Sequence, residues 1–175
     1  MIRPLRDLGN DYLLLAGWLS DHRVLAWYQG RDRPFDLPRA RDELGPIARG
    51  ETEVNGCIVE RISMPIGYLQ YYPVLDPADY ALESAERTVG MDLFLGEPDL
   101  WGKGLGTRVI RLAMGMIFES AEVERLVIDP HADNPRALRA YEKAGFGRIK
   151  VLPAHELHEG EYRDCWLMEA RREAK

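Results

Sequence analysis

Apolar positions along the chain recur with two periods, one typical of helices and one typical of strands. Helical spacing predicts helices over 10–20, 38–48, 106–119 and 135–144, with a short turn or helix over 23–28. Compact apolar runs predict strands over 1–5, 57–60, 66–72 (joined to its predecessor by a turn at 63–65), 89–95, 125–129, 149–152 and 165–169. The later part alternates strand and helix, which predicts an α/β protein with a mixed central sheet.

Residues that start and stop helices sharpen these boundaries. Asn10 and Asn134 stand at N-cap positions, and Pro135 follows the second of them. Pro38 falls in the first turn of its helix, and Gly145 closes the last helix. No repeat or low-complexity linker interrupts the chain, so residues 1–175 are predicted to form a single domain with a substantial core.

Residues 101–107 read W-G-K-G-L-G-T, with glycine at alternate positions between a predicted strand and a predicted helix. Glycines let backbone N–H groups close around an anion, and a helix N-terminus adds partial positive charge. The loop therefore suits a pyrophosphate, or it is a glycine-rich turn without a ligand. It lacks the spacing of a Walker P-loop, and it lies too late in the chain for a dinucleotide fingerprint.

Composition narrows the class of partner. The chain has 46% hydrophobic and 30% charged residues and a net charge of −6, without a basic stripe. These values argue against nucleic acid and anionic membranes, and they fit a cationic small molecule. No apolar run is long enough to span a membrane, and we expect a cytoplasmic protein. Cys57 and Cys165 are predicted to be buried free thiols in a reducing compartment.

Two segments at matching separation resemble the GNAT acetyltransferase superfamily. The glycine loop is similar to its acetyl-CoA pyrophosphate loop, and residues 134–146 (N-P-R-A-L-R-A-Y-E-K-A-G-F) are similar to its helix with an Asn and a Tyr near the CoA arm. The resemblance implies a GNAT-type mixed sheet flanked by helices, with acetyl-CoA as co-substrate. It assigns the cofactor to Phe94, Leu95, Trp101, Gly102, Lys103, Gly104, Leu105, Gly106, Thr107 and Asn134.

Within the superfamily the chain most resembles the aminoglycoside 6′-N-acetyltransferases. The segments that carry this resemblance are 25–32, 65–70, 90–98, 129–131 and 152–160. Trp101 stands where the superfamily usually has Gln or Arg, a departure that these enzymes share. The implied reaction moves an acetyl group directly to the 6′-amine of an aminoglycoside in a ternary complex, which confers resistance. A monomer or a homodimer is compatible with it.

The resemblance also implies two catalytic residues. Asp92 would be the general base, and strand alternation places it on the same face as Phe94. The alternative is an Asp at a sheet end that is solvated or bonded to a turn. Tyr141 would protonate the departing thiolate, although its helical spacing equally fits a core tyrosine.

Acidic and aromatic residues supply the candidate drug contacts. Asp129 would bind an ammonium group or start the turn at Pro130. The long loop 73–87 contains acids that line a cationic pocket or form a solvated run. The predicted substrate residues are Trp27, Tyr28, Gln70, Asp79, Glu83 and Asp129, and Trp27 equally fits the core.

Other functions remain open at this point. A GNAT enzyme acting on a siderophore precursor or a protein N-terminus would share the same motifs. A non-catalytic acyl-CoA-sensing module would keep the glycine loop but would not need Asp92 and Tyr141 together. No metal is predicted: His131, His155 and His158 lack the helical spacing of an open metal site and are read as surface or structural residues.

Overall fold

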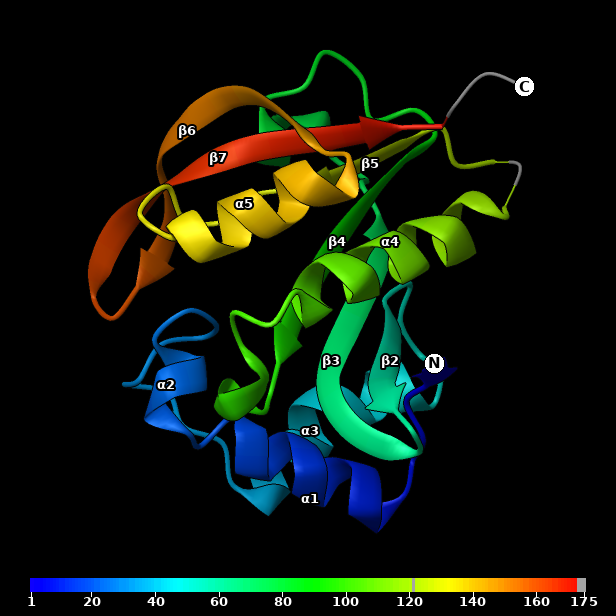
Figure 1. Cartoon of the computed structure of the whole chain (residues 1–175), viewed down its shortest axis with the longest axis vertical. Coiled ribbons are helices and arrows are strands. Elements are labelled where there is room, and N and C mark those ends of the chain that lie inside the picture. The colour runs from blue at the N-terminus through cyan, green and yellow to red at the C-terminus, as the bar shows by residue number, and fades with distance from the viewer. Residues whose placement is uncertain (121, 173–175) are drawn as a thin grey trace. The chain divides into compact units, whose positions relative to one another are not determined.

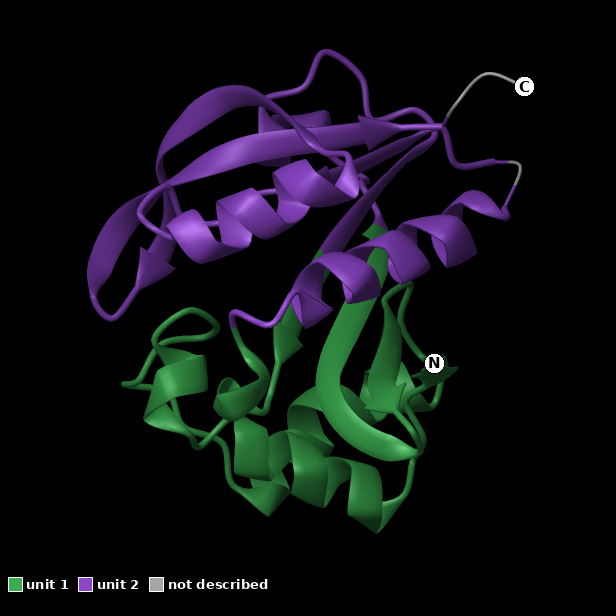
Figure 2. Ribbon diagram, in the orientation of Figure 1, with its two compact units in different colours: residues 1–72, 92–101 green, residues 73–91, 102–175 purple. Residues whose placement is uncertain are grey.

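The structure is a computed structural model that describes residues 1–120 and 122–172. It contains two compact units, each built from two stretches of chain (Figure 2). Unit 1 comprises residues 1–72 and 92–101, and unit 2 comprises 73–91 and the residues from 102 onward. Strand β4 (Thr88–Leu95) begins in unit 2 and ends in unit 1. Each unit is described separately below.

Unit 1 consists of short helices and antiparallel strands (Figure 1). Its elements are β1 (Ile2–Pro4), α1 (Gly9–Trp18), α2 (His22–Leu25), α3 (Leu37–Ala48), β2 (Asn55–Arg61), β3 (Met64–Pro73), the end of β4, and the 3-10 turn η2 (Pro98–Leu100). β2 pairs antiparallel with both β1 and β3. Ile62 and Ser63 form the turn between β2 and β3 with φ of 50° and 60°, so the turn falls earlier than predicted.

Helices α1 and α3 cover the core of unit 1. Tyr12, Leu15 and Trp18 of α1 are buried together with Leu44 of α3. The prediction that Asn10 caps the first helix is wrong, because α1 begins at Gly9 after a residue that makes no side-chain cap bond.

Unit 2 combines a sheet with two amphipathic helices. Its elements are η1 (Pro77–Tyr80), the start of β4, α4 (Leu105–Phe118), β5 (Arg125–Ile128), α5 (Pro135–Ala144), β6 (Gly147–His158) and β7 (Glu161–Arg171). β4 and β5 run parallel, whereas β7 is antiparallel to both β5 and β6. The strand order β1-β2-β3-β4-β5-β7-β6 defines a mixed, seven-stranded sheet flanked by helices, as predicted.

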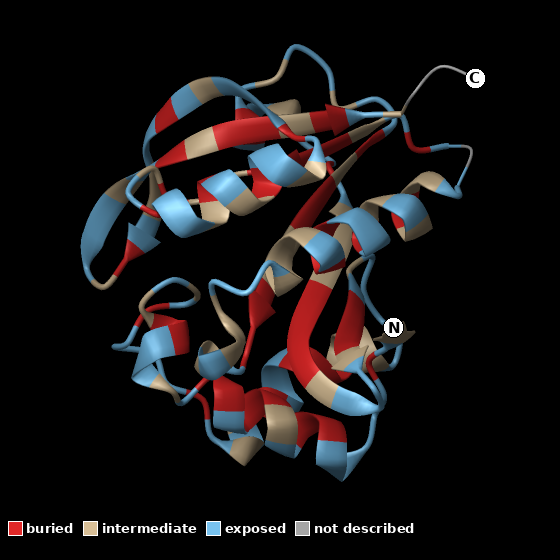
Figure 3. Ribbon diagram, in the orientation of Figure 1, coloured by how far each residue is buried: buried red, intermediate tan, exposed pale blue. Residues whose placement is uncertain are grey.

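The boundaries of α5 match the sequence closely. Asn134 is its N-cap and accepts a hydrogen bond from the N–H of Ala137 at 3.1 Å. Gly145 ends the helix with a φ of 122°, a conformation that favours glycine. Leu138 and Tyr141, three positions apart, are buried, and much of the rest of the helix surface is exposed (Figure 3).

The hairpin of β6 and β7 is much longer than predicted. The two strands contain 12 and 11 residues, whereas the sequence predicts strands only over 149–152 and 165–169. The outer half of β6 is rich in polar residues, and the register shifts between Leu152 and Glu156. A short apolar run therefore marked only the inner half of the hairpin.

Two further expectations can be compared with the structure. Cys57 and Cys165 are free and buried, as predicted. Burial raises the pKa of Cys57 to about 11 and, with nearby carboxylates, that of Cys165 to about 12. No helix among the described residues is long and apolar enough to cross a membrane.

Candidate functional site

Asp92 is held by a chain of hydrogen bonds that starts in the core of unit 1. Nε2 of Gln70 donates to Oδ2 of Asp92 at 2.9 Å, and the hydroxyl of Tyr68 donates to Oε1 of Gln70 at 3.1 Å. Tyr68 and Gln70 are two apart on β3 and therefore point to the same face. Tyr68 is 1% exposed, and its burial raises the pKa of its hydroxyl well above the usual range. A neutral donor chain thus orients this half-buried carboxylate.

Phe94, two positions further along β4, is part of an aromatic cluster. Its ring centroid lies 4.7 Å from Tyr28 and 6.1 Å from Trp18, with the Trp18 ring edge-on. The Phe94 side chain is thus engaged by protein, so its predicted contact with a cofactor would use the main chain. Trp27 is 38% exposed, and the alternative that it belongs to the core is wrong.

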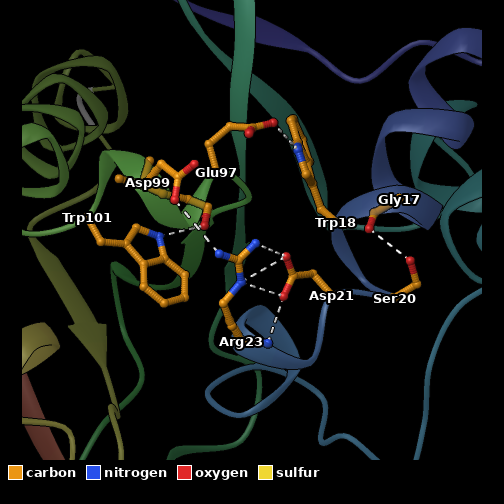
Figure 4. A network of polar contacts seen from close by, with 9 residues as sticks. Gly17, Trp18, Ser20, Asp21, Arg23, Glu97, Asp99 and Trp101 are labelled. Carbon is orange, nitrogen blue, oxygen red and sulfur yellow. Dashed lines mark hydrogen bonds and ion pairs between the residues drawn. The ribbon is translucent and has the colours of Figure 1, made fainter.

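The segment that follows β4 is fastened to the N-terminal helices of unit 1 (Figure 4). The indole of Trp18 donates to Oε1 of Glu97 at 3.0 Å, and Arg23 lies 3.8 Å from Asp99. The indole of Trp101 donates to the carbonyl of Leu95 at 2.9 Å, which closes the segment on itself. This contact gives Trp101 a structural role that the sequence did not indicate.

Two glycines in unit 1 permit close packing that sequence reasoning missed. A Cβ at Gly67 would lie 2.3 Å from the carbonyl oxygen of Phe94, and a Cβ at Gly96 would lie 2.2 Å from the Trp18 ring. The N–H of Gly96 donates to the carbonyl of Ile66 at 2.9 Å. The N–H of Gly96 therefore already has a partner in the main chain of β3.

In unit 2 the glycine loop leads into α4. Gly102 and Gly104 have φ of 74° and 75°, and a Cβ at either would meet nothing within 4 Å. These glycines are therefore required by backbone conformation and not by crowding. Gly104 is the N-cap of α4 and provides no side-chain bond to the first turn. A helix start without a side-chain cap, next to the exposed Lys103, suits an anion.

The later residues of this motif connect two helices. The hydroxyl of Thr107 donates to the carbonyl of Ala140 in α5 at 3.4 Å, and a Cβ at Gly106 would lie 4.0 Å from Ala140. Tyr141 is 5% exposed and packs edge-on against Phe146, with ring centroids 5.6 Å apart. Its ring therefore belongs to the core of unit 2, and the role of its hydroxyl stays a prediction.

Asp129, directly after β5, is paired with a histidine. Its Oδ2 lies 2.9 Å from Nε2 of His155, and the side chains are 21% and 25% exposed. The hydrogen bond to Asp129 raises the pKa of His155, with further contributions from Glu156 and Asp79. The sequence had read His155 as a surface or structural residue, and no linear spacing links it to a residue 26 positions away.

The acidic loop of unit 2 has a buried anchor. Tyr80 is 6% exposed and packs with Val127 and Leu167, and its ring lies 6.3 Å from His155. Asp79 is exposed beside it and near enough to His155 to raise its pKa. Glu83 is exposed as well. Asp79 thus interacts electrostatically with the Asp129–His155 pair.

Comparison with known proteins identifies the class. A family model described as "Acetyltransferase (GNAT) domain" matches residues 7–153, so the chain belongs to the GNAT acetyltransferase family. It is 32% identical over 141 residues to aminoglycoside N(6')-acetyltransferase type 1 of Klebsiella pneumoniae, which covers 79% of this chain and 70% of that protein.

Solved structures agree with this assignment. The structure of aminoglycoside acetyltransferase AAC(6')-Ib in complex with coenzyme A and kanamycin superposes with a TM-score of 0.82 at 27% identity, over 98% of this chain and 94% of that one. A spermidine N-acetyltransferase from Vibrio cholerae, solved with CoA and spermine, has a TM-score of 0.78 at 16% identity over 98% of this chain and 94% of that one. The second likeness concerns the fold alone.

Proposed function

We propose that this protein transfers the acetyl group of acetyl-CoA to the 6′-amine of aminoglycosides and thereby confers resistance. The observation that carries the proposal is the likeness, at 27% identity over 98% of the chain, to an aminoglycoside acetyltransferase solved with coenzyme A and kanamycin. A cytoplasmic location, where acetyl-CoA is made and thiols stay reduced, is part of the proposal. So is a monomeric or homodimeric state.

The chemistry assigned to Asp92 follows from its oriented carboxylate. It takes a proton from the substrate ammonium, directly or through a water molecule, and leaves a nucleophilic amine. The amine attacks the thioester carbon, a C–N bond forms, and the C–S bond breaks. Tyr141 donates a proton to the departing CoA sulfur, and the proton that the attacking nitrogen loses as the amide forms restores the Tyr141 hydroxyl, directly or through water. The reaction needs neither a covalent acyl-enzyme nor a metal.

The glycine loop is assigned to the CoA pyrophosphate. Gly104→Val would force a β-branched residue to a φ of 75°, a strain of about 1–3 kcal/mol. We expect CoA to bind roughly 10-fold more weakly in calorimetry, with the fold intact by circular dichroism. Leu112→Val, an exposed site within α4, is the control for general damage to the helix. Unchanged CoA affinity in folded Gly104→Val would contradict this assignment.

The activity is tested by measuring CoA thiol release with acetyl-CoA and a panel of acceptors. We expect release with kanamycin and not with an aminoglycoside that carries a hydroxyl at position 6′. Mass spectrometry and NMR of the product should place one acetyl group on the 6′-nitrogen. Preferred acetylation of a hydroxylamine or of a peptide N-terminus would favour the other GNAT specificities. CoA binding without turnover on any acceptor would favour a sensing module.

A further inference from the structure

Three side chains with metal-binding chemistry meet in unit 2, close along the chain to the Asp129–His155 pair. His131 follows β5, and Glu156 and His158 lie on the outer half of β6. One ligand atom from each residue lies within 4.8 Å of the other two. This group is called the His-Glu-His cluster below.

The strand pairing explains how these residues meet. Glu156 and His158 are two apart on β6, so both point to the same face of the hairpin. His131 forms an isolated antiparallel bridge with Cys165 of β7, the strand that also pairs with β6. β7 therefore pairs with β6 on one side and with the segment at His131 on the other. The cluster joins the end of β6 to the connection between β5 and α5.

The geometry of the cluster is compact. Nε2 of His131 lies 2.9 Å from Oε2 of Glu156, and Nδ1 of His158 lies 3.9 Å from Oε1 of the same carboxylate. The two imidazole rings are 4.7 Å apart and nearly perpendicular.

His158 provides the independent indication of a missing partner. Its side chain is 4% exposed, and neither ring nitrogen has a hydrogen-bond partner among the described residues. A buried polar group without a partner destabilises a fold, and such groups are rare. Nε2 of His158 also lies 3.9 Å from Oε1 of Glu159, a carboxylate well placed to orient the ring from its far side.

Two imidazoles and one carboxylate are a common ligand set for Zn²⁺ with one position left for water. Zinc bonds of about 2.0–2.1 Å in a tetrahedron separate the ligand atoms by about 3.3 Å. The separations of 2.9 Å and 3.9 Å from Glu156 to the two histidines bracket that value, and all three ligand atoms lie within 4.8 Å of one another, so small side-chain rotations suffice. Mg²⁺ and Ca²⁺ prefer oxygen ligands and do not suit this set.

We propose that His131, Glu156 and His158 bind one Zn²⁺ ion, which fastens the β6–β7 hairpin to the connection between β5 and α5. Glu159, now 3.9 Å from the second nitrogen of His158, would accept a hydrogen bond from it and fix the ring once the ring turns onto the ion, as carboxylates commonly do behind a metal-bound histidine. The ion stabilises this part of unit 2 and takes no part in acetyl transfer. Asp129 and Asn134 flank His131 on the connection that the ion would hold.

The test uses the full chain, freed of metal with a chelator and then titrated with Zn²⁺ against a chromophoric competitor. We expect one equivalent to bind and the melting temperature to rise, because a ligand selective for the folded state stabilises it. Co²⁺ should give the visible absorption of tetrahedral coordination, and Mg²⁺ should leave both readouts unchanged.

Variants assign the site to these residues. Glu156→Gln keeps the size of the side chain and an acceptor for His131, so the fold is retained. We expect it and His158→Gln to weaken Zn²⁺ binding by at least about 100-fold, because outer-shell partners alone contribute about 10–100-fold. The chain has four histidines, and His22→Gln and His155→Gln are the matched controls that should bind normally.

Three outcomes would overturn the proposal. One is wild-type protein that binds no Zn²⁺, which would leave the cluster as a hydrogen-bonded pair beside a buried histidine. Another is equal binding by wild type and folded Glu156→Gln, which would place the ion elsewhere. Loss of binding in His22→Gln would likewise point to a surface site.

Discussion

Asp92, within β4 of unit 1, and Asp129, directly after β5 of unit 2, are both half-buried carboxylates, but the hydrogen bonds described for them differ in kind. Asp92 accepts from the neutral amide of Gln70, whereas Asp129 is paired with His155, which titrates. A neutral donor orients a carboxylate without competing for a proton or a cation. A neutral histidine competes with the carboxylate for a proton, and a protonated histidine competes with a substrate cation for the carboxylate. The contrast suits a base in unit 1 and an adjustable cation site in unit 2.

The largest effect that would sharpen this contrast is expected at Asp92. Asp92→Asn keeps the shape and the contact with Gln70 but cannot accept the proton, so turnover should fall by about 10²–10⁴-fold. Steady-state kinetics with kanamycin, and calorimetry with CoA, would separate this loss from weakened cofactor binding. Near wild-type turnover across pH would remove Asp92 from the role of base.

The next effect concerns the donor chain behind Asp92. Gln70→Leu removes a hydrogen bond to a charged group, and such bonds contribute about 1.5–3 kcal/mol. We expect kcat to fall at least about 10-fold. Tyr68→Phe is the matched control, because it keeps the bond between Gln70 and Asp92 and should cost only a few-fold. If Tyr68→Phe is as damaging as Gln70→Leu, packing and not orientation explains both.

Asp129 should affect substrate affinity and leave turnover largely intact. Asp129→Asn is expected to raise KM for kanamycin by a few-fold to about 10-fold, consistent with one partly exposed ion pair. In the wild type KM should also rise with salt, because the Debye length falls from about 10 Å at 0.1 M to about 3 Å at 1 M. The salt slope should be shallower in the variant. A KM that is independent of salt in both proteins would contradict an electrostatic role.

The smallest effect is the pH dependence of the Asp129–His155 pair. Because Asp129 raises the pKa of His155 in the fold, the pair stabilises the protein below the ordinary histidine pKa of about 6.5, and this contribution is lost as pH rises through the folded value. His155→Gln should therefore reduce the free energy of unfolding by up to about 1 kcal/mol at pH 5.5 and by less at pH 9. Urea titrations at both pH values would measure it. A difference that does not change with pH would assign the effect to packing.

Local signals in the sequence were sufficient for part of the molecule. The ends of α5 are marked by single residues, with Asn134 and Pro135 at the start and Gly145 at the end. The strand before the glycine loop is predicted by its apolar run. The mixed sheet and the family follow from motif order. The assignment of all residues to one domain stays a prediction.

Partners distant in sequence could not be predicted. Gln70 and Asp92 are 22 positions apart, and Asp129 and His155 are 26 apart. Strand pairing in the sheet brings such pairs together. The pairing of the outer half of β6 could not be predicted, because that half is rich in polar residues. His131 and His158 are 6% and 3% exposed, so of the two predicted alternatives, surface or structural, the surface one is wrong for both. Neither histidine has a local sequence signal of burial.

The packing at Gly67 and Gly96 limits how this protein can evolve. An added Cβ at either position would lie under 2.5 Å from the Phe94 carbonyl or the Trp18 ring. Neither glycine is assigned to chemistry, yet both should tolerate substitution as poorly as Asp92 does in a selection for survival on the drug. Trp27 is exposed, so variation toward new aminoglycosides is expected there and not at the two glycines. Adaptation of this scaffold should therefore proceed through its outer aromatic positions, while the close packing of β3 against the end of β4 remains fixed.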